Sequence, residues 1–234
     1  MRRTGYQRRQ TGGSGNRGSG RPGSGPPGSG NAAARPPGRI RIVAGRFRGR
    51  RIPVADLPGL RPTPERTRET LFNWLQGRLD GARVLDLFAG SGALGFEALS
   101  RGASEVVLVE KDRRACLKLS EVAASLDPDH CQVVQADALN WPRSTGQTFD
   151  LILIDPPFAA GLTVAALAHI QTRHLLAVDG RVYCEASSRE TPAPWVDPQS
   201  GAWQVLKETR AGDSRGALLA AAASDISDEE TEQP

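Results

Sequence analysis

The chain has 234 residues, 38% of them hydrophobic and 24% charged, which is enough for one domain with tails but hardly for two separate cores. Thirteen arginines precede the first acidic residue, Asp56, whereas 17 basic and 26 acidic residues follow, so residues 1–55 carry +13 and residues 56–234 carry −9. This one-sided charge predicts that a polyanion contacts the amino-terminal quarter first.

Three cysteines, Cys116, Cys131 and Cys184, are far apart in the sequence and form no Cys-x-x-Cys pair. This spacing argues against a disulfide framework and against a thiolate metal site, and it is typical of a reducing compartment. No apolar run reaches membrane-spanning length, and no apolar segment follows the first arginines as a secretory signal requires. We therefore expect a cytoplasmic protein without a metal and without membrane contact.

The first elements in chain order are a tail and a basic hairpin. Residues 1–38 consist mostly of Gly, Arg, Ser, Pro and Gln, and with almost nothing to bury they predict a disordered tail. Residues 39–54 alternate apolar and basic side chains around Gly45 and Gly49. That pattern predicts a β-hairpin with one arginine-rich face.

A helix is expected next, over residues 61–78. Thr63-Pro64-Glu65 offers a capping hydroxyl, a proline at the first helical position and an acid in the first turn. Leu71, Phe72 and Leu75 then recur at three-to-four spacing, which indicates one apolar face.

From Arg83 onward, short apolar runs alternate with helical patterns. The runs predict strands over residues 84–88, 106–110, 132–137, 150–155 and 181–186, with helices over residues 93–100, 113–126 and 162–177. Apolar runs without a polar face are typical of strands buried on both faces, so we expect an α/β fold with a mostly parallel sheet. Residues 203–210 and 215–222 predict a closing antiparallel pair, and the acidic residues 223–234 predict a second disordered tail.

A glycine-rich segment, DLFAGSGALG, runs from Asp86 to Gly95 at the junction of the first buried strand and its helix. Gly90 and Gly92 allow a tight turn and leave no side chain between the backbone and a ligand, as in a nucleotide crevice. The spacing is not the G-x-G-x-x-G of dinucleotide enzymes. Asp86, four residues before the first glycine, is instead suited to accept hydrogen bonds from a cationic amino-acid group.

Two further acids follow the next two predicted strands. Glu110 stands twenty residues after Gly90, where an acid in a nucleoside-binding α/β fold holds both ribose hydroxyls. Asp137 ends the third strand and is placed to accept from an adenine amino group. Each acid alone is also compatible with an ordinary surface carboxylate. Three acids ending three successive strands beside a glycine turn favour a nucleoside site.

The sharpest signal is Asp155-Pro156-Pro157-Phe158, which follows an apolar strand and so lies at the same sheet edge as the glycine turn. The prolines stiffen the backbone and remove two N–H donors, which leaves carbonyls free to accept. An exocyclic base amine is a poor nucleophile because its lone pair is delocalised. Acceptance of both hydrogens, by the Asp155 carboxylate and the Pro156 carbonyl, turns that lone pair towards a sulfonium methyl. Phe158 is expected to stack on the base.

These segments resemble the bacterial RsmD family of small-subunit ribosomal RNA guanine-N2 methyltransferases. The likeness runs from about Ile40 to Glu185 and is carried by RIVAGRFRGRRIPV, GLRPTPERTRETLFNWL, LDLFAGSGALGFEALSRGA and IDPPF. It implies a Rossmann-like class I methyltransferase fold with a seven-stranded sheet over residues 39–222. It also implies S-adenosylmethionine as cofactor and, as acceptor, the 2-amino group of a guanine in small-subunit ribosomal RNA.

The resemblance and the charge pattern together give three groups of site residues. The residues expected at the reacting amine are Asp155, Pro156 and Phe158. The residues expected around the cofactor are Thr63, Phe72, Asp86, Phe88, Gly90, Ser91, Gly92, Glu110, Lys111, Asp137 and Ala138. The residues expected to contact RNA are Arg39, Arg41, Arg46, Arg48, Arg50, Arg51 and Arg61. We expect a monomer whose substrate is a small-subunit particle or an assembly intermediate.

Other functions remain open from the sequence. Adenine-N6 methyltransferases of DNA or RNA share the Asp-Pro-Pro-Phe tetrad, and a non-catalytic RNA-binding ribosome-assembly factor would use the same arginines. Protein glutamine methylation is less favoured, since its tetrad usually begins with Asn. The missing G-x-G-x-x-G disfavours a dehydrogenase.

Overall fold

The computed structural model describes residues 38–57, 63–141, 146–157, 161–196 and 201–222. The two predicted tails therefore lie outside the described residues, apart from Gly38. No helix within the described ranges is both long and apolar enough to cross a membrane.

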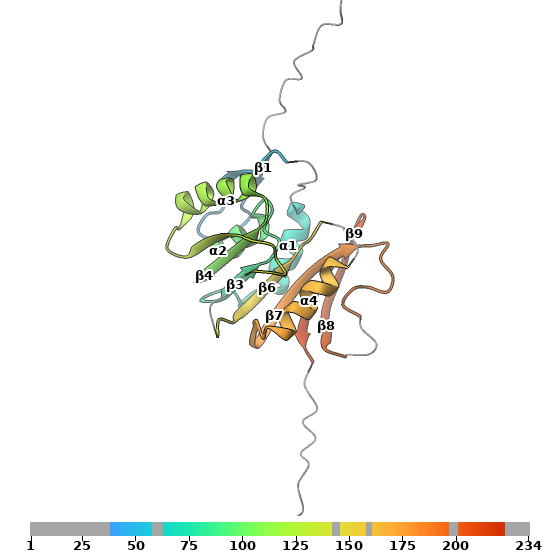
Figure 1. The fold of residues 1–234 in the computed structure, drawn as a ribbon. Helices are drawn as coiled ribbons and strands as arrows, with labels where there is room; N and C mark the ends of the chain where they lie inside the picture. The colour runs from blue at the N-terminus through green and yellow to red at the C-terminus, as the bar shows by residue number, and fades with distance from the viewer. Residues whose placement is uncertain (1–37, 58–62, 142–145, 158–160, 197–200, 223–234) are drawn as a thin grey trace, which may run out of the picture. The chain divides into compact units, whose positions relative to one another are not determined.

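The predicted strands form one seven-stranded sheet in the order β5-β4-β3-β6-β7-β9-β8 (Figure 1). The first five strands in that order, β5, β4, β3, β6 and β7, are parallel to one another. Strand β9 is antiparallel to both of its neighbours, β7 and β8. The predicted mostly parallel sheet and its closing antiparallel pair are therefore confirmed. The strands are β3 (Arg83–Asp86), β4 (Glu105–Glu110), β5 (Cys131–Gln135), β6 (Phe149–Ile154), β7 (Leu176–Ser187), β8 (Trp203–Ala211) and β9 (Ser214–Ala221).

The strand order reverses at β3. From β3 the chain adds β4 and β5 on one side, and it then crosses to the other side to add β6 and β7. In open α/β sheets, ligands bind at such a switch point, outside the carboxyl ends of the strands. Here the switch point lies between the carboxyl ends of β3 and β6.

Helices cover both faces of the sheet (Figure 1). The core on one face includes apolar residues of α1 (Glu65–Trp74), α2 (Ala93–Ser100) and α3 (Arg113–Leu126), and the core on the other face includes those of α4 (Leu162–Thr172). Successive strand residues alternate between the two cores, as Val84 and Leu85 do. This double burial explains why the strands read as continuous apolar runs.

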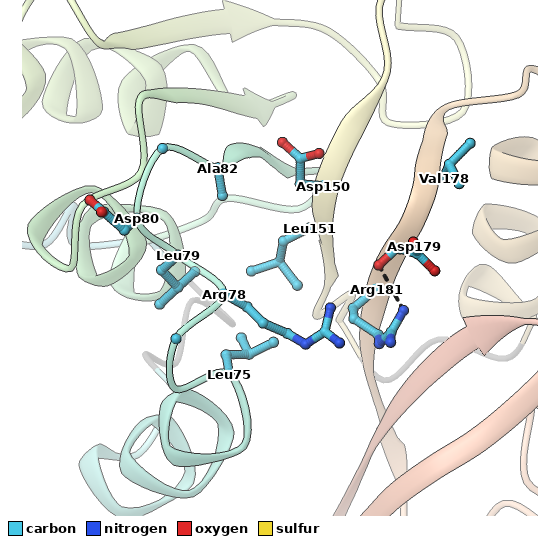
Figure 2. Close-up of a pocket in the computed structure, with 12 residues that line it drawn as sticks. Leu75, Arg78, Leu79, Asp80, Ala82, Asp150, Leu151, Val178, Asp179 and Arg181 are labelled. Atoms are coloured by element: carbon cyan, nitrogen blue, oxygen red, sulfur yellow. Dashed lines mark hydrogen bonds between the residues drawn. The ribbon is translucent and has the colours of Figure 1, made fainter.

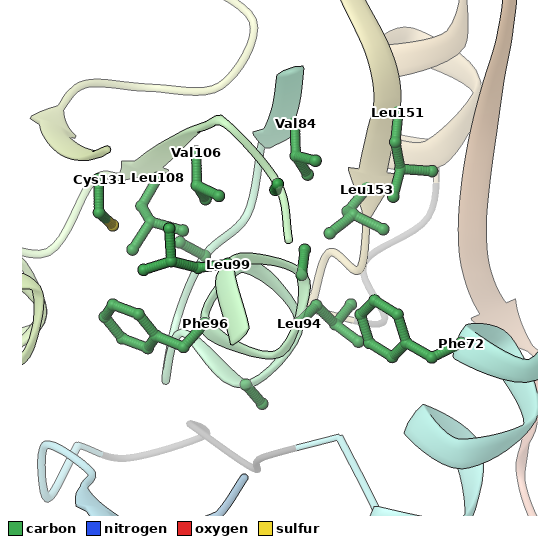
Figure 3. Packing of buried hydrophobic residues seen from close by; sticks show 14 of the residues in the cluster. Phe72, Val84, Leu94, Phe96, Leu99, Val106, Leu108, Cys131, Leu151 and Leu153 are labelled. Atoms are coloured by element: carbon green, nitrogen blue, oxygen red, sulfur yellow. The ribbon is translucent and has the colours of Figure 1, made fainter. Parts of the chain in front are cut away.

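Helix α2 packs closely on the sheet, and all eight of its residues are buried. Figure 3 shows Phe96 and Leu99 of α2 beside Val106 and Leu108 of β4. A Cβ atom added at Gly95 would come within 2.2 Å of Leu108 Cδ2, so the third glycine of the motif is needed for this close approach.

The predicted basic hairpin is confirmed as β1 (Arg39–Arg41) paired antiparallel with β2 (Arg51–Pro53). Ile40 and Ile52 stand opposite each other and are buried, whereas the neighbouring arginines are exposed. The alternation of apolar and basic residues therefore separates a core face from an arginine face.

One buried carboxylate holds the hairpin loop on the domain. Glu97 of α2 is fully buried and accepts hydrogen bonds from the backbone N–H groups of Val43 (2.8 Å) and Ala44 (3.0 Å). It also accepts from Arg68 Nη1 at 3.2 Å and from Arg101 Nε at 2.8 Å. Four donors from the loop, α1 and α2 thus compensate one buried charge.

Some expected details of the local structure are wrong. The helices expected over residues 61–78 and 162–177 are shorter, since α1 spans Glu65–Trp74 and α4 ends at Thr172, and β7 already begins at Leu176. Helix α1 begins at Glu65 after Pro64, and no side chain caps it, so Thr63 does not serve as the predicted cap. The Thr63 hydroxyl instead donates to Asp155, 92 residues away in the sequence. Strand β5 ends at Gln135, so Asp137 lies two residues beyond the strand it was expected to end.

We predict that Glu97→Gln lowers the free energy of unfolding by about 3 kcal/mol, because it removes the charge that compensates two buried guanidinium contacts. Urea denaturation followed by circular dichroism measures this change. Glu121→Gln, which removes an exposed acid paired with Lys118, is the control and is expected to change stability by less than about 0.5 kcal/mol. Equal effects of the two substitutions would contradict the assigned role of Glu97.

Candidate active site

Two turns meet at the switch point of the sheet. Asp86, at the end of β3, pairs in register with Leu153 of β6, so the glycine turn after β3 and the Asp155-Pro156-Pro157 corner after β6 lie at the same edge. Gly90 and Gly92 have φ angles of +51° and +76°, a region that disfavours other residues. A Cβ atom at Gly92 would also lie 2.3 Å from the Phe96 ring.

Asp86 is a buried acid with one unsatisfied oxygen. It is 1% exposed, its Oδ2 accepts from the Gly95 N–H at 3.1 Å, and its Oδ1 has no hydrogen-bond partner among the described residues. Burial raises the pKa of Asp86 to about 7, although the backbone N–H groups of Gly95 and Phe88 lower it in part. An unpaired buried acceptor is suited to a ligand that brings a cationic donor.

Glu110 ties the end of β4 to the glycine turn. Its Oε2 accepts from the Gly90 N–H at 2.9 Å, and its Oε1 accepts from the Asp112 N–H at 2.8 Å. Each carboxylate oxygen keeps a further lone pair, and Glu110 is partly exposed. The two hydrogen bonds thus fix the Glu110 side chain, and both of its oxygens can still accept a further hydrogen bond.

Asp155 lies beside a second carboxylate, that of Glu185. The register of β6 and β7, in which Ile154 pairs with Cys184, brings the two acids together at the sheet edge. Burial, followed by the charge of Glu185, raises the pKa of Asp155 well above its usual range. The Thr63 hydroxyl, which donates to Asp155 Oδ2 at 2.8 Å, opposes this rise.

Glu185 was not among the site residues predicted from the sequence. Glu185 is almost fully buried and accepts from the Tyr183 hydroxyl at 2.9 Å and from the Ser214 hydroxyl at 2.8 Å. Burial raises its pKa also. Its position within the apolar run of residues 181–186 could have identified Glu185 as a candidate, because an acid in a buried strand needs hydrogen-bond partners or a function.

The three acids Asp86, Asp155 and Glu185 lie on one face of the sheet. Each stands two residues after a member of the core that carries α1 and α2, namely Val84, Leu153 and Tyr183. None of the three forms an ion pair with another described residue. This sheet edge therefore holds three acids next to the glycine turn whose charge, when they are ionised, no described residue compensates.

The other predicted cofactor and amine residues take different positions. Ser91, Gly92, Ala138, Pro156, Thr63 and Phe72 are buried, Glu110 and Phe88 are partly exposed, and Lys111 and Asp137 are exposed. Asp137 Oδ1 accepts from the Leu139 N–H at 3.0 Å. Phe72 packs in the core near Leu94, as Figure 3 shows. Phe158 and Arg61 lie outside the described residues.

Only some of the hairpin arginines lack a partner among the described residues. Arg41 pairs with Glu65 at 2.5 Å, Arg46 pairs with Asp127, and Arg50 Nη1 donates to the Ser125 carbonyl at 3.2 Å. The exposed side chains that have no partner among the described residues are Arg39, Arg48 and Arg51.

A cavity of about 410 Å³ lies at the opposite end of the strands. Its lining includes Ala82, just before β3, and Asp150, near the start of β6. Figure 2 shows Arg78 extending towards β7, where Arg181 Nη1 donates to the Asp179 carbonyl at 2.7 Å. This cavity is therefore separate from the site at the carboxyl ends of the strands.

No group of three or more His, Cys, Asp or Glu side chains in the described ranges is arranged to hold a metal ion.

We predict that Thr63→Val raises the pKa of Asp155 further, because the substitution removes a hydrogen bond that stabilises the ionised carboxylate. A carboxyl ¹³C NMR titration of the ligand-free protein measures the pKa. Thr63→Ser keeps the hydroxyl and is expected to leave the pKa close to that of the parent protein. An unchanged or lowered pKa in Thr63→Val would show that this hydrogen bond does not control Asp155.

Comparison with known proteins agrees with this geometry. The family model described as "Conserved hypothetical protein 95" matches residues 40–220. Ribosomal RNA small subunit methyltransferase D of Escherichia coli is 41% identical over 175 residues, which cover 75% of this chain and 86% of that protein. The protein of the same name from Haemophilus influenzae is 36% identical over 75% of this chain and 90% of its own length.

The solved structure of yhhF from Escherichia coli superposes with a TM-score of 0.69 at 37% sequence identity and covers 80% of this chain and all of that one. The family model and these relatives span most of the chain, including the glycine turn and the Asp155 corner. The chain therefore belongs to the RsmD family of class I methyltransferases, which use S-adenosylmethionine as the methyl donor.

Proposed function

We propose that this chain methylates the exocyclic 2-amino group of a guanine in small-subunit ribosomal RNA. The observation that carries the proposal is the juxtaposition of the glycine turn with Asp86, Asp155 and Glu185 at one sheet edge. Similarity to proteins named ribosomal RNA small subunit methyltransferase D supports ribosomal RNA as the substrate class.

The residues at this edge fit S-adenosylmethionine, which supplies a methyl group on a positively charged sulfur. The unpaired Oδ1 of Asp86 would accept from the ammonium of the methionine part, and Glu110 would hold the ribose hydroxyls. Asp137 would accept from the adenine amino group. A positive charge on the sulfur would favour the ionised forms of Asp86, Asp155 and Glu185, so these acids would favour the cationic cofactor over its neutral product.

The segment Asp155-Pro156-Pro157 would bind the target amine through hydrogen bonds. The Asp155 carboxylate and the Pro156 carbonyl would accept the two amine hydrogens, and neither Pro156 nor Pro157 has an N–H donor that would repel them. These two hydrogen bonds would orient the nitrogen lone pair towards the methyl carbon. Its stabilising effect grows as positive charge develops on nitrogen, and so it acts mainly in the transition state.

The transferred proton has a nearby acceptor. As the nitrogen–carbon bond forms, the carbon–sulfur bond breaks and its electron pair stays on sulfur. The amine then loses a proton to Asp155 or to water. The raised pKa of Asp155 makes its carboxylate a better proton acceptor than an ordinary exposed aspartate.

The hairpin arginines would guide the RNA towards this edge. Arg39, Arg48 and Arg51 are exposed and unpaired among the described residues, so they are available to phosphates. We propose that the substrate is a small-subunit particle or an assembly intermediate, and that the chain acts as a cytoplasmic monomer.

Mass mapping of modified nucleotides in small-subunit RNA tests the proposal. Undermethylated small subunits would be incubated with the protein and radiolabelled S-adenosylmethionine, with protein-free RNA and duplex DNA as parallel substrates. Label in N2-methylguanine is the expected result. Label in N6-methyladenine, or binding of RNA with no methyl transfer, would refute the guanine-N2 assignment.

We predict that Asp155→Ala lowers turnover by about 100-fold or more and weakens S-adenosylmethionine binding far less than it lowers turnover. The reason is that Asp155 is assigned to contact the amine, whereas it acts on the cofactor only through its charge. Single-turnover methyl transfer and calorimetry measure the two quantities, and thermal unfolding checks the fold. Wild-type turnover in this variant would count against the mechanism.

We predict that the triple substitution Arg39→Gln, Arg48→Gln and Arg51→Gln weakens RNA binding and reduces the slope of log K against log[salt] by about two. Each arginine lost removes one phosphate contact and the counterions that it displaces. Fluorescence anisotropy at several salt concentrations measures the slope.

The control for this prediction removes three exposed arginines outside the hairpin, Arg113, Arg173 and Arg189. It is expected to keep most of the salt dependence. If the slope of log K against log[salt] falls equally in both triple variants, the effect reflects general charge, and the hairpin is not the RNA-binding surface.

A further inference from the structure

An arginine on β9 is buried without a hydrogen-bonding or ion-pair partner in the part of the chain that the structure describes. Arg215 is 6% exposed, and it forms no ion pair and no side-chain hydrogen bond with any described residue. Its Nε atom is buried and unsatisfied. Its guanidinium carbon lies 5.9 Å from the centre of the Trp195 ring.

Trp195 adds a second unsatisfied donor at the same place. Its side chain is 2% exposed, and its indole Nε1 is also buried with no acceptor among the described residues. Buried N–H groups are nearly always paired, because an unpaired donor loses its hydration without compensation. Two unpaired donors side by side, one of them on a charged group, call for an acceptor that the described residues do not supply.

Arg68, the other arginine that is buried in the described ranges, differs from Arg215 in its charge partner. Arg68 is 3% exposed, and it pairs with Glu97 and donates to the Arg41 carbonyl, although its own Nε has no partner among the described residues. Arg215 is almost as deeply buried and has neither kind of partner. A bound anion with several acceptor oxygens would supply both the missing charge and the missing acceptors.

Arg215 lies at the same edge of the sheet as Asp155. Strand β9 is antiparallel to β7, and Arg215 pairs with Ala186 next to Glu185, so the first residues of β9 lie where the parallel strands end. Adjacent strands are about 4.8 Å apart, which places β9 about 10 Å from β6 across β7. Arg215 shares its strand face with Ala217 and Leu219, in the core that carries α4 and Trp195.

We propose that Arg215 and Trp195 form a binding site for a phosphate group of the substrate RNA, at the same edge of the sheet as Asp155 but on the face that carries α4. The guanidinium fork matches two phosphate oxygens, and the indole N–H offers one more donor. The choice of RNA phosphate rests on the proposed function. The anion site itself rests on the two unpaired donors.

The first test compares Arg215→Gln with Arg210→Gln. Arg210 is exposed on β8 and pairs in register with Arg215, so its substitution removes the same charge from the neighbouring strand. Arg215→Gln is expected to weaken binding of a small-subunit RNA fragment about tenfold and to lower the salt slope by about one. Arg210→Gln is expected to stay within about twofold of wild type, and calorimetry with S-adenosylmethionine shows that both variants are folded.

The second test follows the Trp195 indole N–H by ¹⁵N NMR. Inorganic phosphate and the RNA fragment are each expected to shift this signal in the wild type, and Arg215→Gln is expected to abolish both shifts. Trp195→Phe keeps the ring and removes the donor, and it identifies the signal. Its RNA affinity is expected to fall less than that of Arg215→Gln.

The outcomes separate this inference from the proposed function. If wild type binds RNA but Arg215→Gln matches Arg210→Gln and the indole signal stays still, the phosphate site is refuted and the methyltransferase proposal stands. If phosphate shifts the signal but wild type binds no RNA, the anion site stands and the ribosomal RNA proposal fails. A signal that neither probe moves overturns the anion site.

Discussion

Carboxylate groups that lose water and gain no cation are costly to keep ionised, and the site depends on that constraint. Glu97 shows how the scaffold deals with a buried acid, since four donors surround it. At the sheet edge, Asp86 and Asp155 receive fewer hydrogen bonds and no ion pair among the described residues, and burial raises the pKa of both. The charge of Glu97 is therefore compensated within the scaffold, whereas Asp86 and Asp155 lack a cationic partner at the place where a cationic ligand would bind.

The topology produces this arrangement from simple parts. Parallel strands end at one edge, and the crossover after β5 places β6 beside β3, so two turns that are 65 residues apart in the sequence become neighbours. Glu185 joins them through the register of β6 and β7. Thr63, in the segment before α1, then contacts Asp155 from outside the sheet. The segment before α1 therefore contributes a contact to the Asp155-Pro156-Pro157 corner.

Local signals in the sequence were enough to predict much of the fold. Helices α2 and α3 begin and end at the expected residues, since their starts are set locally, for example by Asp112, which accepts from the N–H groups of Arg114 and Ala115. The juxtaposition of the Asp86 and Asp155 segments followed from the parallel arrangement of the strands. The Thr63–Asp155 bond, the Glu185 neighbour and the ion pairs of the hairpin arginines did not follow, because they depend on register and packing between distant segments.

The number of protons released when the cofactor binds tests the central claim most directly. Raised pKa values mean that Asp86 and Asp155 are partly protonated near pH 7 in the free protein, and a cation nearby lowers those pKa values and expels protons. Calorimetry in buffers of different ionisation enthalpy should show proton release with S-adenosylmethionine, less release with S-adenosylhomocysteine, and tighter cofactor binding as the pH rises from about 6 to about 8.5. Cofactor affinity that is independent of pH, with no proton released, would contradict the account.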